Sequence, residues 1–182
     1  MAIESIKLET GMTMPAFNLP DPHGKIYTHN EVSGKKGTLI IFTCNHCPYA
    51  LAVWPRIIEI ASSFKPDGVE TVAINPNIHP GYPADAPDKM AEKIREWNLP
   101  FPYLVDESQN TARAYQAQCT PDIYLFDGGQ KLVYHGRIDD NWKEPEKVTR
   151  NELSNAIKNM LDGKPPFVEQ YPTLGCSIKW RE

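Results

Sequence analysis

The sequence has no long apolar run, few cysteines and little excess charge. Apolar residues nowhere continue for the roughly 18 positions that a membrane-spanning helix needs. The opening residues, MAIESIKLET, lack the charged-then-apolar pattern of a secretory signal peptide, so we expect a cytoplasmic protein. A net charge of −4 on 182 residues argues against nucleic acid or a membrane surface as a partner.

The four cysteines are too few to hold a chain of 182 residues together as a disulfide scaffold. Disulfides of cytosolic proteins tend instead to be catalytic or redox-sensing. A chain of this length can build one core, which buries about 70% of the surface of the unfolded chain. We therefore predict a single domain over residues 1–182, in which residues 164–182 form an extended C-terminal tail that starts within a Gly-Lys-Pro-Pro break at residues 163–166.

Two cysteines lie close together in the stretch LIIFTCNHCPYA, residues 39–50. The apolar run at its start predicts a central strand that is buried on both faces. Pro48 lacks an N–H and is tolerated only in the first turn of a helix, so a helix begins at or just before Cys47. A C-x-x-C pair at such a junction is typical of a redox dithiol. Cys44 would then lie at the positive end of the helix dipole, which lowers the pKa of a thiol.

Thiol–disulfide exchange needs one thiolate that attacks and a second thiol that resolves the mixed disulfide. We assign the attack to an acidic Cys44 and the resolution to Cys47. His46 lies between them in the sequence and would favour the thiolate of Cys44. A stabilised thiolate favours the reduced form, so the dithiol–disulfide couple becomes more oxidising. The alternative is a pair of structural thiols beside a surface histidine.

Strands and helices alternate along the rest of the chain, which predicts a mixed α/β sheet flanked by helices. An N-terminal hairpin turns at residues 21–24, and a proline-rich loop forms a central insertion at residues 76–87. Long ordered loops of this kind often act as lids or binding loops. Strands are predicted at residues 38–42, 69–75, 100–105, 123–126 and 131–137, and later helices at 88–97, 106–117 and 148–161.

Three stretches resemble the redoxins, the group of peroxiredoxins and their thioredoxin-like relatives. They are MPAFNLPDPHG at residues 14–24, the cysteine motif at residues 44–47, and Thr120-Pro121 before an apolar strand. Further similarity, to the peroxiredoxin-like, AhpC/TSA-related branch, lies in PYLVDE at residues 102–107 and GRIDD at residues 136–140. The resemblance implies a thioredoxin-like fold.

The same resemblance implies that Pro121 is cis and leaves the backbone of Thr120 exposed for pairing with a substrate segment. It also brings Cys119 near the dithiol, as a third redox thiol or as a buried core cysteine. Cys176 in the tail could resolve a disulfide with Cys44, link two chains, or stay a reduced, packed thiol. Cys119 and Cys176 are therefore possible accessory thiols.

Several features of the related families are missing. Thr43 stands where thioredoxins carry tryptophan, and residues 38–42 contain no buried acid to accept the proton of the second cysteine. The peroxiredoxin motif Pro-x-x-x-Thr-x-x-Cys fits neither Cys44 nor Cys47. Antioxidant peroxidase activity is therefore kept only as an alternative.

A different class of function is metal binding, because Cys44, His46, Cys47 and Cys119 could ligate zinc. The second C-x-x-C or His pair of most zinc sites is absent, so we expect no metal. A thioredoxin-like module that only binds partners is a further alternative. The sequence favours a cytoplasmic thiol–disulfide oxidoreductase without a bound cofactor, which exchanges with protein or small-molecule thiols and disulfides. A second dithiol protein or a small thiol would reduce it.

Overall fold

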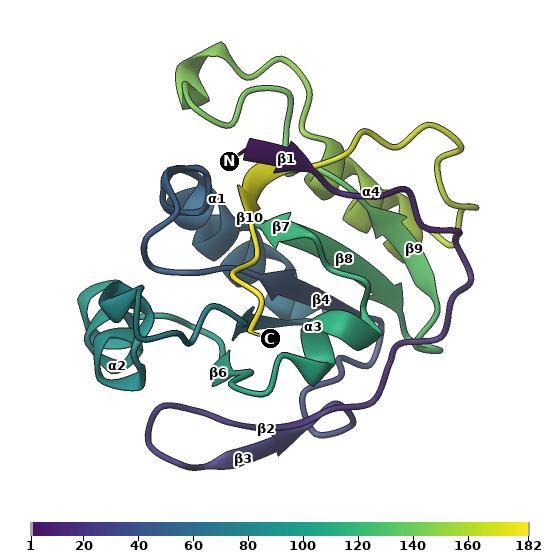
Figure 1. The fold of residues 1–182 in the computed structure, drawn as a ribbon. Helices are drawn as coiled ribbons and strands as arrows, with labels where there is room; N and C mark the ends of the chain where they lie inside the picture. Colours follow the sequence, from purple (N-terminus) through teal and green to yellow (C-terminus); the bar gives the residue numbers. More distant parts are fainter. Residues whose placement is uncertain (1, 182) are drawn as a thin grey trace.

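The computed structural model describes residues 2–181 of the chain, and a five-stranded sheet lies at its centre (Figure 1). The sheet has the order β6 (Tyr103–Val105), β5 (Val69–Asn75), β4 (Gly37–Phe42), β8 (Asp122–Asp127) and β9 (Leu132–His135). Strand β4 is parallel to β5 and antiparallel to β8, and every one of its residues is buried. The structure thus confirms both the mixed sheet and its central apolar strand.

Helices and loops cover both faces of this sheet. The helices are α1 (Pro48–Phe64), α2 (Pro87–Glu96), α3 (Asn110–Ala114) and α4 (Glu152–Leu161). Successive residues of a strand point to opposite faces. Leu39 and Ile41 therefore pack with α1, α2 and α4, whereas Ile40 and Phe42 pack with α3 and the N-terminal segment. A separate apolar core on each side of β4 holds the end of this strand, and the cysteine motif that follows it, in place.

The expected N-terminal hairpin and central insertion are both present. Strands β2 (Asn18–Pro20) and β3 (Ile26–Thr28) pair in antiparallel fashion. Their turn is closed by Asp21, whose Oδ1 accepts hydrogen bonds from the backbone N–H groups of His23 and Lys25. The insertion at residues 76–87 leaves the end of β5 and contains one 3₁₀ turn, Pro83–Asp85. It returns the chain to α2 after passing over the end of the sheet where the cysteines lie.

The C-terminal tail is more ordered than an extended tail implies. Within residues 164–182, Leu174–Ser177 forms strand β10, and residue 182 lies outside the described residues, as does residue 1. Strand β10 is the middle strand of a second sheet, between β1 (Ala2–Glu4) and β7 (Cys119–Thr120) (Figure 1). The tail therefore closes over the loop that contains Thr120.

Two helices differ in length from the prediction, for local reasons. Helix α3 ends at Ala114 rather than residue 117, since Gln116 has a left-handed backbone with φ of 57°. Helix α4 begins at Glu152 rather than residue 148, because Pro145–Lys147 forms a separate 3₁₀ turn. Among residues 2–181, no helix is both long and apolar enough to cross a bilayer.

Candidate active site

The two cysteines of the C-x-x-C motif lie at the junction between β4 and α1. Cys47 occupies the N-cap of α1 and Pro48 its first turn, as the sequence predicts. Cys44 lies three residues earlier, before the helix begins, and neither cysteine has any exposed surface. The helix N-terminus is thus occupied by Cys47, not by Cys44.

The Thr120–Pro121 peptide bond is cis, as the family resemblance implies, and its loop faces both cysteines. The Thr120 hydroxyl is hydrogen-bonded to the Cys44 sulfur at 3.2 Å, and the Thr120 carbonyl accepts from the Cys47 thiol at 3.1 Å. The expectation that the Thr120 backbone is exposed is wrong. Thr120 is fully buried, because β10 pairs with it and places Cys176 opposite.

The structure adds a residue that sequence reasoning missed, the fully buried Asp85. Its Oδ1 accepts hydrogen bonds from the Asn45 backbone N–H at 2.6 Å and from the Asn75 side-chain amide at 3.1 Å. Its Oδ2 is paired with Nδ1 of His46. Asp85 therefore binds both residues that separate the two cysteines and sets the conformation of the motif.

Asp85 lies in the insertion at residues 76–87 and is the only acidic residue of that loop. The loop was expected to be functional, but no residue within it was singled out. A lone carboxylate among prolines was the signal that could have identified it. It is a buried acid beside the first cysteine, whereas the acid that residues 38–42 lack would serve the second.

His46 lies partly exposed over the insertion, with 20% of its side-chain surface accessible. Its ring packs against Tyr82, with ring centroids 4.7 Å apart, and the Lys179 ammonium lies on the Tyr82 ring at 5.5 Å. The Cys44 sulfur, a His46 nitrogen and an Asp85 oxygen all lie within 4.8 Å of one another. These three atoms form a compact set that can move a proton or ligate a metal.

The pKa values of the two thiols shift in opposite directions. Burial, the hydrogen bond with Cys47 and the charge of Asp85 raise the pKa of Cys44 well above its ordinary value. The pKa of Cys47 is lowered to about 5, chiefly because the Cys44 thiol donates a hydrogen bond to it. The Cys176 thiol and the backbone N–H groups of Ala50 and Cys176 also stabilise the Cys47 thiolate. Burial of Cys47 opposes this ionisation, but the hydrogen-bond donors outweigh it.

The acidic thiol of the reduced site is therefore Cys47, whereas we expected Cys44. A helix N-terminus favours a thiolate, as expected. The favoured cysteine is Cys47 rather than Cys44, because the helix starts directly after Cys47.

The two possible accessory thiols have different surroundings. Cys119 is fully buried, its thiol donates to the Pro121 carbonyl at 3.4 Å, and burial raises its pKa far above the ordinary value. Cys176 packs against the cluster of Cys44, Cys47 and Ala50 and is partly exposed. Burial raises the pKa of Cys176 to about 11. Of the two, only Cys176 contacts the dithiol.

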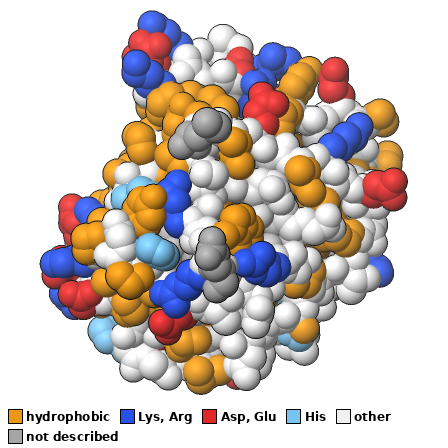
Figure 2. Space-filling view, in the orientation of Figure 1, with side chains coloured by type: hydrophobic (Ala, Val, Ile, Leu, Met, Phe, Trp, Pro, Cys, Tyr) orange, Lys and Arg blue, Asp and Glu red, His pale blue; other side chains and the backbone are white. Residues whose placement is uncertain are grey.

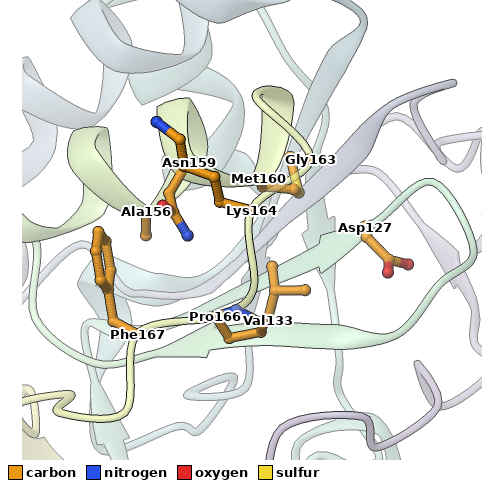
Figure 3. A pocket seen from close by; sticks show the side chains of 9 residues that line it. All are labelled: Asp127, Val133, Ala156, Asn159, Met160, Gly163, Lys164, Pro166 and Phe167. Carbon is orange, nitrogen blue, oxygen red and sulfur yellow. The ribbon is translucent and has the colours of Figure 1, made fainter.

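A pocket elsewhere on the molecule does not belong to this site (Figure 3). It lies between helix α4, strand β9 and the segment after α4, and its described lining contains neither cysteine nor histidine. Its lining residues are Asp127, Val133, Ala156, Asn159, Met160, Gly163, Lys164, Pro166 and Phe167. On the face drawn in Figure 2, acidic and basic side chains lie side by side and form no broad field of one sign. The lining of this pocket and the mixed charges of this face therefore add no second candidate site here.

The chain is similar to known redox proteins along most of its length. Residues 10–135 match the family described as AhpC/TSA. The thiol-disulfide oxidoreductase ResA of Geobacillus thermodenitrificans is 27% identical over 163 residues, which cover 90% of this chain and 82% of that protein.

Two solved structures are similar to this chain in fold. A conserved protein from Geobacillus kaustophilus, described as uncharacterized, is 39% identical and superposes with a TM-score of 0.93, covering 100% of this chain and 97% of its own. The thioredoxin domain of a thiol-disulfide oxidoreductase from Bacteroides vulgatus is 20% identical, with a TM-score of 0.59 over 71% of this chain and 89% of its own. The second likeness shows that the fold is thioredoxin-like, as expected.

Proposed function

This chain belongs to the AhpC/TSA family, and we propose that it is a thiol–disulfide oxidoreductase whose reactive pair is Cys44 and Cys47. One observation carries the proposal: two hydrogen-bonded thiols lie between a cis-proline loop and a buried carboxylate at a helix N-terminus. The name of the ResA relatives, thiol-disulfide oxidoreductase, supports the same reaction class.

The opposite pKa shifts suit two different roles in the exchange. Cys44 holds its proton, so its attack on a substrate disulfide requires a base. The His46–Asp85 pair lies within 4.8 Å of the Cys44 sulfur and accepts that proton as the new sulfur–sulfur bond forms. The first substrate sulfur leaves as a thiolate, and Cys44 is then joined to the second in a mixed disulfide.

Cys47 then resolves the mixed disulfide. Its pKa of about 5 keeps it ionised at neutral pH, so no further proton has to be removed before it attacks the Cys44 sulfur. The attack forms the Cys44–Cys47 disulfide and releases the second substrate thiolate. The Thr120 hydroxyl, at 3.2 Å from Cys44, holds the attacked sulfur in place. A dithiol protein or a small thiol returns the site to its reduced form.

Reduction of a protein disulfide, such as those of insulin, by dithiothreitol tests this function. We expect the protein to accelerate the reaction and Cys44→Ser or Cys47→Ser to abolish the acceleration. Cys119→Ala is the matched control and should keep it, because that thiol faces the Pro121 carbonyl. Absence of acceleration together with hydrogen peroxide consumption that depends on Cys44 would overturn the proposal in favour of an antioxidant peroxidase.

We propose that the exchange takes place in the cytoplasm, with thiols and disulfides of proteins or small molecules as partners. The grouping of three of the four cysteines around one site supports this, since disulfides of reducing compartments are mostly transient and catalytic. Trapping of the Cys47→Ser protein with its disulfide-linked partners in intact cells, followed by fractionation, tests the location. Partners recovered only from an exported fraction would contradict it.

Metal binding is a second candidate, carried by the three ligand atoms of Cys44, His46 and Asp85. The set differs from the expected one, because it contains Asp85 and neither Cys47 nor Cys119. Thiolate, imidazole and carboxylate are all ligands of zinc. Titration of the reduced, chelator-washed protein with zinc chloride distinguishes the two functions. Stoichiometric binding that is lost in Asp85→Asn would favour the metal site.

A further inference from the structure

We propose that Cys176 is a third redox thiol of this site, and that strand β10 presents it to Cys47 in the position of a substrate strand. The inference rests on the proposed thiol–disulfide exchange. It assigns to the C-terminal segment a chemical step that the dithiol alone does not have.

Strand β10 occupies the edge that a substrate was expected to use. It pairs in antiparallel fashion with β7, so that Cys176 lies opposite Thr120, the residue before the cis proline. The reactive residue of a bound substrate strand would lie in the same register, beside the dithiol. The chain thus fills its own docking edge with a strand that carries a cysteine.

The pairing is closely fitted and is held at both ends. A side chain at Gly175 would place its Cβ 2.4 Å from the Thr120 carbonyl oxygen and 3.2 Å from Cβ of Cys119, so only glycine fits there. Before the strand, Thr173 exchanges hydrogen bonds of 2.9 and 3.0 Å with Ser5. After it, the Lys179 N–H donates to the Asn77 side chain at 2.8 Å. This segment is therefore a docked element rather than a loose tail.

The sulfur of Cys176 contacts the dithiol through Cys47. The Cys176 thiol and backbone N–H both donate hydrogen bonds that stabilise the Cys47 thiolate. Cys44 and Cys47 have no exposed surface, whereas Cys176 is partly exposed. Among these three cysteines, Cys176 is the one with exposed surface.

This arrangement allows the disulfide to move within the chain. In the oxidised site, the Cys176 thiolate attacks the Cys47 sulfur, the Cys47–Cys176 bond forms, and the Cys44–Cys47 bond breaks. Cys44 leaves as a thiolate and takes up the proton that Cys176 lost, so no external oxidant or reductant is consumed. The disulfide then ends at a partly exposed residue, where a reducing thiol can approach it more easily than at the fully buried Cys44–Cys47 pair.

Disulfide mapping of the full chain tests the proposal. Trypsin places Cys44 and Cys47 together on residues 37–56, Cys176 on residues 159–179 and Cys119 on residues 114–131. Cys44→Ser, oxidised with diamide at low protein concentration and then blocked, should yield residues 37–56 linked to residues 159–179. Cys47→Ser is the matched control. It keeps one cysteine on each of the same two peptides and should give little of this link.

The wild type provides a readout that does not depend on folding of a variant. A part of the oxidised protein should carry the link between residues 37–56 and 159–179 while Cys44 remains open to alkylation. Equal linkage in both serine variants, or none in Cys44→Ser and the wild type, would overturn the proposal. Cys176→Ser separates the two hypotheses, because it cannot form the link to residues 159–179 but keeps both cysteines of the Cys44–Cys47 disulfide. Absence of the Cys44–Cys47 disulfide and of insulin reduction in the wild type would instead refute the proposed function.

Discussion

Asp85 and His46 are joined by a hydrogen bond across 39 residues of sequence, from the end of a proline-rich insertion to the centre of the cysteine motif. The same carboxylate accepts from the Asn45 backbone, and the Asn45 side chain donates to the Ala84 carbonyl at 2.9 Å. The insertion therefore belongs to the active site, and it determines both the shape of the motif and the charge that Cys44 experiences.

Replacement of Asp85 by asparagine should slow disulfide reduction by about 10²-fold, the size of a typical general acid–base contribution. The amide keeps the shape of the side chain, but it cannot accept the Cys44 proton as a carboxylate does. Steady-state insulin reduction over a range of pH measures the loss. Asp88→Asn, an exposed acid in the same part of the chain, should leave the rate unchanged. Equal rates for Asp85→Asn and the wild type would remove Asp85 from the mechanism.

Cys47 should ionise at a lower pH than the other three cysteines. Titration of thiolate absorbance in the reduced protein should show one thiolate forming near pH 5. An ordinary thiol would instead ionise with a pKa of about 8.5. Cys44→Ala should raise this pKa, because the donor that lowers it most is removed. Cys44→Ser retains a hydroxyl donor and should raise it less. An early thiolate that disappears in Cys47→Ser identifies the residue, whereas one that persists would show that another cysteine carries the charge.

The same ionisation predicts how stability depends on pH. Cys47 has a lower pKa in the folded than in the unfolded chain, so it contributes stability that is fully present above the unfolded pKa, about 8.5. That contribution falls as the pH drops and is lost below the folded pKa of about 5. Urea unfolding of the reduced wild type and of Cys47→Ser should therefore give free energies of unfolding that differ more at pH 8 than at pH 5. A difference independent of pH would mean that Cys47 is not ionised.

Gly175→Ala should displace strand β10 from Thr120. The added Cβ would lie 2.4 Å from a backbone oxygen, and overpacking of this kind typically costs about 1–3 kcal/mol. We expect faster alkylation of Cys47 and less of the Cys47–Cys176 disulfide. Leu174→Ala changes an exposed side chain of the same strand and serves as the control. Unchanged alkylation in Gly175→Ala would show that β10 does not shield the dithiol.

Much of the fold could be predicted from local patterns. The apolar run before Thr43 lies on β4, and the positions of Pro48 and of the turn at Asp21 match a helix start and a hairpin. Each of these depends on residues that are neighbours in the chain. The strand in the tail was missed because Leu174–Ser177 contains a glycine, a cysteine and a serine rather than an apolar alternation, and it is stabilised by pairing with β1 and β7.

By itself, the sequence determined the redox motif, the strand and helix on either side of it, and the resemblance that indicates a thioredoxin-like fold. The order of the residues is enough for these features, because periodicity and proline chemistry act within a few positions. Only the tertiary structure decided which thiol is acidic, which carboxylate lies beside the dithiol and what covers Thr120. Those properties depend on contacts between segments far apart in the sequence, such as Cys47 with Thr120 and His46 with Asp85. Burial and charge act on a thiol through space, so no pattern along the chain could assign them.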